Sequence, residues 1–206
     1  MIAFSCKGRG MCPSCNTRRM VETAAHLADH VPPRLPVRQW VLSVPKRLRY
    51  FLQTDTALQG AVLRIFLRAV ERCLRKHSRG CCASARIGAV AFIHRFSSSL
   101  NEHVHFHCCI IDGVFEPTAN EVTGAVFHAA SGLDAAVLAD VQAMVRRRVV
   151  SVFVRRGLIG KSDADVMGSW EHGGGFSVDA SVCSGDADRV GLERLLHYCA
   201  ATHNFP

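Results

Sequence analysis

Three histidines stand at every second position of one apolar run, and this run constrains the fold more than any other segment. Residues 101–113 have the sequence NEHVHFHCCIIDG. Alternate side chains of a β-strand point to opposite faces, so His103, His105 and His107 would share one face while the apolar residues between them pack into the core. Neutral imidazoles arranged in this way can bind one divalent ion. A surface strand whose histidines bind nothing is the alternative, and the residues alone leave both open.

Charge is distributed unevenly along the 206 residues. Residues 1–100 hold 17 Lys and Arg against 4 Asp and Glu, whereas residues 101–206 hold 8 against 13. Clustered cations gain affinity for a polyanion by neutralising phosphates and releasing counterions, so the first half is expected to face nucleic acid. A solvated basic surface without a partner is the alternative.

Ten cysteines occur without a secretory signal or an apolar run long enough to span a membrane. A reducing cytoplasm and no membrane partner are therefore expected, and clustered thiols there favour metal binding. Cys12 and Cys15 have the spacing of a zinc knuckle, and Cys6 is a candidate third ligand. A redox pair is disfavoured because no strand precedes the motif. Neighbouring cations are expected to contact phosphates: Lys7, Arg9, Arg18 and Arg19.

A proline-rich stretch at positions 32–36 separates the N-terminal part from the rest. Proline cannot continue a helix, so the amphipathic helix expected around residues 19–30 ends there. The sequence therefore predicts a partial zinc-binding segment at residues 1–31 and a larger domain at residues 37–206.

In the larger domain, apolar residues recur at the spacing of strands in some segments and of helices in others. Strands are expected at 39–44, 86–96, 101–113 and 176–182, and helices at 57–77, 133–156 and 186–199. This mixture predicts an α+β fold in which the histidine strand is central. Cations after the first strand and along the first of these helices are further candidates for phosphate contacts: Lys46, Arg47, Arg64 and Arg68.

Five segments, in their order along the chain, resemble the rolling-circle transposases of the insertion sequence ninety-one family, which belong to the HUH superfamily of single-strand DNA endonucleases. These segments are residues 4–20, 37–43, 101–113, 174–180 and 192–199. The resemblance implies an HUH-type antiparallel sheet of five strands flanked by helices, with a partial zinc ribbon at the N-terminus that binds Zn²⁺. It implies single-stranded DNA at transposon ends and target as the partner.

The resemblance also implies roles for particular residues. His105 and His107 correspond to the His-hydrophobe-His pair, which with a third ligand holds Mg²⁺ or Mn²⁺ against the scissile phosphate. His103 and His172 are the candidates for that third ligand. Tyr198, on a C-terminal helix, corresponds to the nucleophile that forms a covalent phosphotyrosine and frees a 3′-hydroxyl.

The sequence departs from the family at both ends. Residues 200–206 do not match the family pattern after the tyrosine, and the family's additional zinc ligands would precede residue 1, so a fragment is expected. A catalytically inactive DNA-binding remnant is therefore the second hypothesis. A metalloenzyme acting on a soluble substrate is the third, and it leaves the basic half unexplained. The oligomeric state is not indicated.

Overall fold

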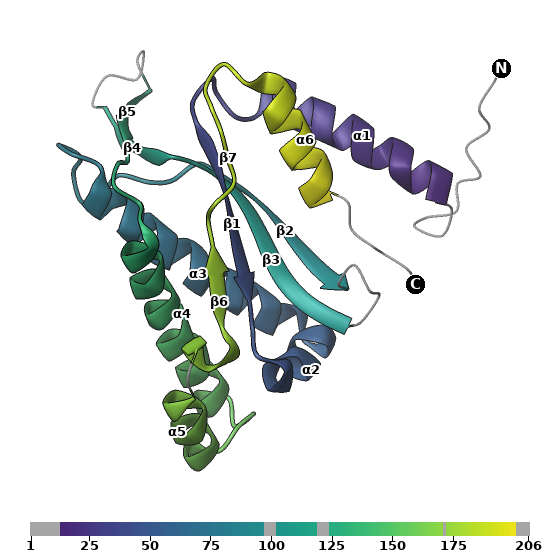
Figure 1. Ribbon diagram of the computed structural model, residues 1–206, viewed down its shortest axis with the longest axis vertical. Helices are drawn as coiled ribbons and strands as arrows, with labels where there is room; N and C mark the ends of the chain where they lie inside the picture. The colour runs from purple at the N-terminus through teal and green to yellow at the C-terminus, as the bar shows by residue number, and fades with distance from the viewer. Residues whose placement is uncertain (1–12, 97–101, 119–123, 171, 201–206) are drawn as a thin grey trace.

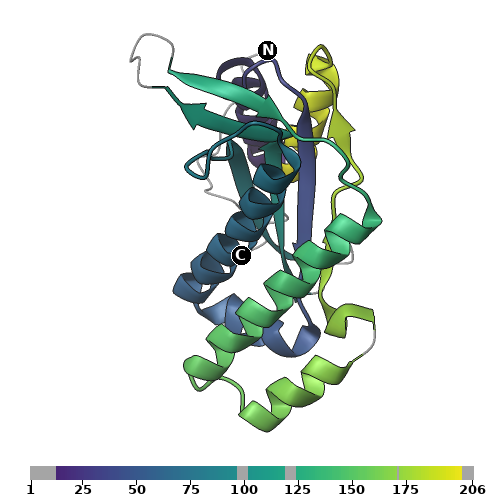
Figure 2. The ribbon, with the colours of Figure 1, turned by 90° about the vertical axis from the view of Figure 1, so that its left-hand side faces the viewer.

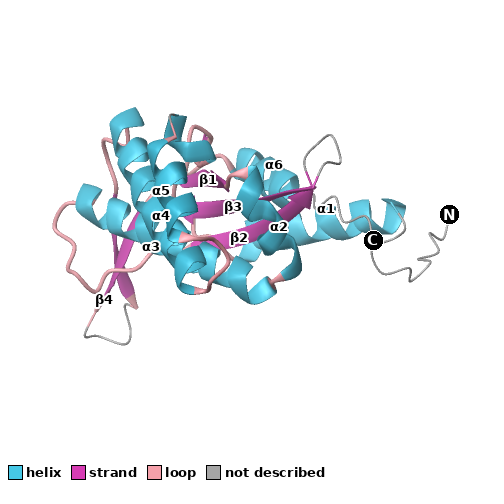
Figure 3. Cartoon of the chain, turned by 90° about the horizontal axis from the view of Figure 1, so that it is seen from below, coloured by secondary structure: helices cyan, strands magenta, loops and turns pink. Residues whose placement is uncertain are grey.

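The computed structural model describes residues 13–96, 102–118, 124–170 and 172–200, and these form the mixed helix and antiparallel-sheet fold that the sequence predicts (Figure 1). The main sheet has five strands in the described residues: β1 (Val37–Ser43), β2 (Ala89–Phe96), β3 (Glu102–Ile111), β6 (Ser177–Asp179) and β7 (Cys183–Ser184). The strand order is β2-β3-β1-β6, with β7 also pairing with β1. The histidine strand β3 therefore lies between two others, as Figure 3 also shows.

Strand register decides which side chains meet across the sheet. β1 and β3 run antiparallel, with Ser43 opposite His105 and Val41 opposite His107. β2 and β3 also run antiparallel, and His94 of β2 lies opposite His105. Directly opposed residues share a face, so His94 is on the histidine side of the sheet.

The alternation expected in the histidine strand is confirmed on its apolar side. Val104, Phe106, Cys108 and Ile110 of β3 are fully buried in the main hydrophobic core. Helices α2 (Lys46–Thr54), α3 (Thr56–His77) and α4 (Ala135–Arg155) contribute the facing side chains of that core (Figure 2). Burying one such aliphatic or aromatic side chain stabilises the fold by about 1.5–3 kcal/mol.

Helices α1 (Pro13–His30) and α6 (Arg189–Ala200) lie on the opposite, histidine side of the sheet. Their apolar stripes form a second core with Cys109 and Ile111 of β3. Asp188 begins α6 as its N-cap, because its Oδ1 accepts a hydrogen bond from the Gly191 amide at 2.8 Å. Of the helices that the structure describes, none combines the length and the apolar character needed to cross a membrane.

The remaining elements lie at the edge of the molecule. β4 (Gly113–Pro117) and β5 (Ala125–Ala129) form a separate two-stranded sheet, while α5 (Lys161–Ser169) and the short 3-10 helix η1 (His172–Gly175) follow α4. The strand expected at 176–182 is shorter than predicted. Its pairing with β1 ends at Asp179. The chain contacts β1 again at Val182, whose carbonyl oxygen accepts a hydrogen bond from the backbone N–H of Gln39 at 2.9 Å.

Candidate metal and nucleophile site

The histidine side of the sheet brings together three imidazoles from two strands. His105 and His107 come from β3, and His94 comes from β2. Among the described residues, these three form a group in which the potential ligand atoms all lie within 4.8 Å of one another. That spacing allows one small ion to reach all three side chains after modest movement. His94 was missed by the sequence analysis.

Hydrogen bonds fix the protonation of two of these rings. Nδ1 of His105 lies 2.7 Å from the carbonyl oxygen of His103, and Nε2 of His94 lies 2.7 Å from the carbonyl oxygen of Cys199. A carbonyl oxygen only accepts, so each of these ring nitrogens carries the proton. The neutral ring then has a lone pair on its other nitrogen, Nε2 of His105 and Nδ1 of His94, which is the arrangement of a metal-ligating imidazole.

The third ring, His107, is held by a side-chain amide. Nε2 of Gln39 lies 2.9 Å from Nδ1 of His107 and 3.0 Å from Sγ of Cys199. Gln39 and His107 are only 5% and 4% exposed, so neither side chain can exchange these partners for water without moving. Gln39 therefore connects the histidine group to helix α6.

The environment keeps the histidines neutral near pH 7. Burial, reinforced by His94 and His105, lowers the pKa of His107 to about 3. Burial, with Arg49 and His105 acting in the same direction, lowers the pKa of His103 to about 4. Burial also lowers the pKa of His105, although its bond to the His103 carbonyl opposes the shift. Neutral rings keep their lone pairs available for a metal ion.

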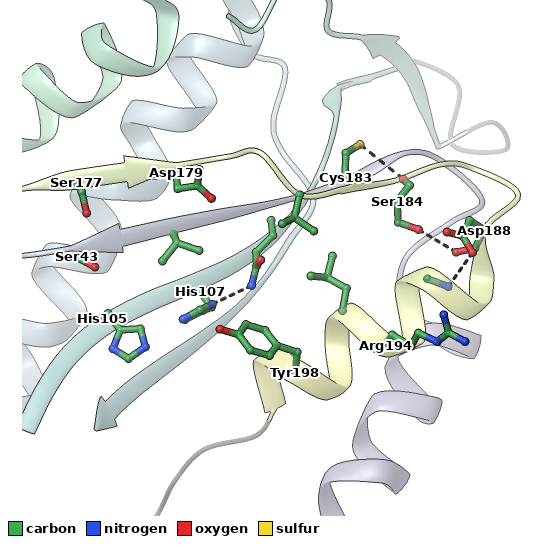
Figure 4. A pocket seen from close by; sticks show the side chains of 15 residues that line it. Ser43, His105, His107, Ser177, Asp179, Cys183, Ser184, Asp188, Arg194 and Tyr198 are labelled. Carbon is green, nitrogen blue, oxygen red and sulfur yellow. Dashed lines mark hydrogen bonds between the residues drawn. The ribbon is translucent and has the colours of Figure 1, made fainter. Parts of the chain in front are cut away.

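Tyr198 of α6 faces the histidines across an open groove of about 790 Å³. Its ring centroid lies 5.7 Å from that of His107, in an edge-to-face arrangement. Figure 4 shows the phenol directed toward His107 and His105, with Asp179 of β6 on the floor of the same groove. Tyr198 is 60% exposed, so its hydroxyl is open to a ligand that enters from solvent.

Arg49 of α2 is a second residue that the sequence analysis did not select. Its Nε donates to the carbonyl oxygen of Val44 at 2.8 Å, which holds the side chain at the end of β1. Its charge contributes to lowering the pKa values of both His103 and His105, so the guanidinium lies within electrostatic reach of the histidine group. Burial lowers the pKa of Arg49 itself.

The structure gives His103 a different environment from the other three histidines. Its ring lies tilted beside that of His105 with centroids 4.9 Å apart, but the three-histidine group contains His94 in its place. Its buried Nε2 has no hydrogen-bond partner among the described residues. The other predicted third ligand, His172, belongs to η1, and its side chain lies outside the description.

Most of the predicted phosphate-contacting residues are not brought to this groove. Arg64 and Arg68 are exposed on α3, whose apolar stripe packs against the sheet face opposite the histidines. Arg47 pairs with Asp163 at 2.8 Å, and Arg18 pairs with Glu22 at 2.7 Å. Lys46 and Arg19 are exposed at α2 and α1.

The predicted zinc site lies outside what the structure describes. Cys6, Cys12, Lys7 and Arg9 fall in the undescribed residues 1–12, and the side chain of Cys15, in the first turn of α1, is also undescribed.

Comparison with protein families gave two matches. A family described as "Putative transposase" matches residues 88–202, which include β2, β3, the histidine group and α6. A family described as "Transposase zinc-binding domain", of the insertion sequence ninety-one type, matches residues 1–44. Neither a curated protein nor a solved structure matches the chain.

Proposed function

This chain belongs to the transposases of the insertion sequence ninety-one family, and from that premise we propose that it nicks and rejoins single-stranded DNA through a covalent 5′-phosphotyrosine at Tyr198. The family membership makes DNA its substrate. The position of the Tyr198 ring, 5.7 Å from the ring of His107 in an open groove, is the observation that carries the proposed mechanism. A nucleophile and a metal-ligating group at that separation can act on one phosphodiester between them.

The proposed step exchanges one phosphoester for another. The phenolic oxygen of Tyr198 attacks the scissile phosphorus, a bond forms between them, and the bond from phosphorus to the 3′-oxygen breaks. The phenol loses its proton and the departing 3′-oxygen gains one, so no water is consumed. The phosphotyrosine conserves the energy of the ester, and a later 3′-hydroxyl can attack it to rejoin strands and release Tyr198.

The residues fit a divalent ion beside the phosphate. The bonds of His94 and His105 to backbone carbonyls place the lone pair of each neutral ring on the nitrogen that does not face the carbonyl. His94, His105 and His107 would hold the ion. When bound, the ion would polarise a phosphoryl oxygen and orient the substrate. Of the two ions expected from the sequence, Mn²⁺ suits three imidazoles better than Mg²⁺, which prefers oxygen ligands.

Cations of this chain would hold the DNA backbone around the groove. Arg49 is one candidate, because its charge acts on His103 and His105 and a guanidinium forms paired hydrogen bonds to phosphate. At the N-terminus, Cys6, Cys12 and Cys15 would bind Zn²⁺, and the interleaved cations Lys7, Arg9, Arg18 and Arg19 would contact a phosphate backbone. Buried thiols such as Cys108 and Cys109, and a DNA substrate, fit a cytoplasmic location.

The experiment is a covalent-adduct assay. The purified chain is incubated with labelled single-stranded oligonucleotides from transposon ends and Mn²⁺, and the products are separated on a denaturing gel. We expect a shifted band that persists under denaturing conditions and is lost in Tyr198→Phe and in His105→Ala/His107→Ala. The Tyr50→Phe variant is the matched control and should keep the band. Salt-sensitive binding without any adduct would instead make the chain a non-catalytic DNA-binding protein.

A further inference from the structure

Gln39 joins the histidine group to the helix that carries Tyr198, and we propose that it is a positioning residue whose amide reverses when the histidines bind a divalent ion. This inference rests on the metal site of the proposed function. It concerns the chain's own hydrogen bonds, which can be observed without any DNA reaction.

The side-chain amide of Gln39 faces His107 with its nitrogen. The amide nitrogen of Gln39 carries two hydrogens and only donates, so Nδ1 of His107 at 2.9 Å must accept. A neutral imidazole that accepts at Nδ1 carries its proton on Nε2. That nitrogen then has no lone pair for a metal ion, in contrast to Nε2 of His105 and Nδ1 of His94, whose rings donate to carbonyls.

Metal binding at Nε2 of His107 requires the other tautomer. The ring must then carry its proton on Nδ1, and a hydrogen on Nδ1 cannot face the hydrogens of an amide NH₂. Rotating the Gln39 amide by half a turn presents Oε1 to Nδ1 in place of Nε2, with little change in shape. The ring stays neutral throughout, because Nε2 gives one proton to solvent and Nδ1 takes one up.

The second partner of Gln39 can follow the same reversal. Nε2 of Gln39 lies 3.0 Å from Sγ of Cys199, which accepts in this arrangement. A thiol is both a weak donor and a weak acceptor, so Cys199 can donate its hydrogen to Oε1 after the amide turns. The thiol of Cys109, 3.7 Å away, can still donate to Cys199. After the amide turns, the Nδ1–H of His107 and the thiols of Cys199 and Cys109 each face an acceptor.

Burial makes the choice of amide orientation matter. Gln39 and His107 are 5% and 4% exposed, and Cys199 is fully buried, so water cannot substitute for a mismatched partner. Because Cys199 directly follows Tyr198, the same amide that selects the His107 tautomer also contacts the end of α6. Gln39 therefore acts through His107 and Cys199 and needs no contact with DNA.

Nitrogen-15 NMR of the histidine rings tests the tautomer directly. Spectra are recorded on the whole chain without metal at the histidines and after adding Zn²⁺, a diamagnetic probe, with His107 assigned by its loss in His107→Gln. We expect the proton of His107 on Nε2 before Zn²⁺ and on Nδ1 after it. In Gln39→Glu, whose carboxylate only accepts, the proton should be on Nδ1 in both states. An unchanged wild-type tautomer would overturn the proposal.

Mn²⁺ affinity, measured by electron paramagnetic resonance of the free ion, gives the second readout. Gln39→Met keeps the side-chain length without the amide and should weaken Mn²⁺ binding by roughly 10- to 100-fold, the cost of losing an outer-shell partner. Gln39→Glu should bind Mn²⁺ at least as tightly as wild type. This second variant keeps the proposal testable if the Gln39→Met chain does not fold. Undiminished binding by a folded Gln39→Met would contradict the proposal.

The control variant His105→Ala distinguishes a failure of the metal site from a failure of the role proposed for Gln39. If His105→Ala abolishes Mn²⁺ binding while Gln39→Met does not affect it, the metal site stands and the role of Gln39 is refuted. If His105→Ala also binds Mn²⁺ like wild type, the histidines do not form the site, and both this proposal and the metal-assisted mechanism fail. A covalent DNA adduct without any Mn²⁺ effect would refute the metal-assisted mechanism alone, because the NMR and Mn²⁺-affinity tests of Gln39 do not depend on the DNA reaction.

Discussion

Nε2 of His94 donates to the carbonyl oxygen of Cys199 at 2.7 Å, which links strand β2 to the end of the helix that carries Tyr198. The last carbonyls of a helix have no partner within the helix, so this bond satisfies one of them and fixes the end of α6 over the sheet. It also places the lone pair of the neutral His94 ring on Nδ1, and His94 is a member of the histidine group. One side chain thus takes part in both the proposed metal site and the placement of the proposed nucleophile.

Replacing His94 tests that double role. His94→Ala removes a metal ligand, so Mn²⁺ affinity should fall by more than the roughly 10- to 100-fold expected for an outer-shell partner. It also removes the bond to the Cys199 carbonyl, worth about 1 kcal/mol. The matched control is His103→Ala, which lies outside the three-histidine group and should bind Mn²⁺ more tightly than His94→Ala does. Titration calorimetry of both variants decides which histidine completes the site.

The free energy of unfolding of the metal-free chain should depend on pH in a specific direction. In the unfolded chain a histidine has a pKa of about 6.5, whereas folding lowers the pKa of His107 to about 3 and that of His103 to about 4. Below pH 6.5 the unfolded state therefore binds more protons, so stability is full above that pH and declines as the pH falls toward 3.

Urea denaturation between pH 4 and 8, with a chelator present, measures this dependence. The slope against pH should be smaller in His107→Gln than in wild type and unchanged in the control His26→Gln, since His26 is exposed on α1. A wild-type chain that gains stability on acidification over this range would show that the histidines are not held neutral by folding.

The apolar side of β3 should dominate the stability of the sheet. Phe106 is fully buried in the core beneath α3 and α4, so Phe106→Ala should lower the free energy of unfolding by about 3–5 kcal/mol through lost contacts and a residual cavity. Tyr50→Ala, at a residue 69% exposed, should change it by no more than about 0.5 kcal/mol. Comparable effects at the two positions would contradict the burial of Phe106 in the core.

Arg49 should contribute to DNA binding through its charge. Arg49→Gln removes one cation beside the histidine group, so the slope of log affinity against log salt for a single-stranded oligonucleotide should become shallower by about 0.7. Arg64→Gln is the comparison, because Arg64 is exposed on α3 across the sheet from the groove. A reduced slope in Arg64→Gln alone would move the DNA to the opposite side of the molecule.

Periodicity was sufficient to predict which face of β3 is buried and where the long helices lie. The spacing of Val104 and Phe106 predicts their burial because strand geometry has a period of two. Helix α2 is not among the expected helices, because the cations that follow the strand at 39–44 are interpreted only as phosphate contacts, although Pro45 directly precedes the helix and proline is common at helix starts. Leu48 and Leu52, buried four residues apart, carry the helical signal.

The site itself was only partly predictable, because strand register is a property of the folded sheet. His94 is a single histidine in an apolar strand, and only its pairing opposite His105 gives it significance. An antiparallel pairing of the strand at 86–96 with the histidine strand is expected from the short serine turn between them, but the register that places His94 opposite His105 is not. Gln39 carries no sequence signal, since its contacts with His107 and Cys199 span 68 and 160 positions of the chain.

The most direct test of the account is to locate the covalent DNA attachment by mass spectrometry. The denaturation-resistant adduct is treated with nuclease and trypsin, which cuts after Arg194 and releases residues 195–206 with Tyr198 as their one tyrosine. A nucleotide mass is expected on Tyr198 of that peptide. The other tyrosine, Tyr50, falls in the peptide of residues 50–64. A nucleotide on Tyr50, or no nucleotide on any peptide, would contradict the central claim.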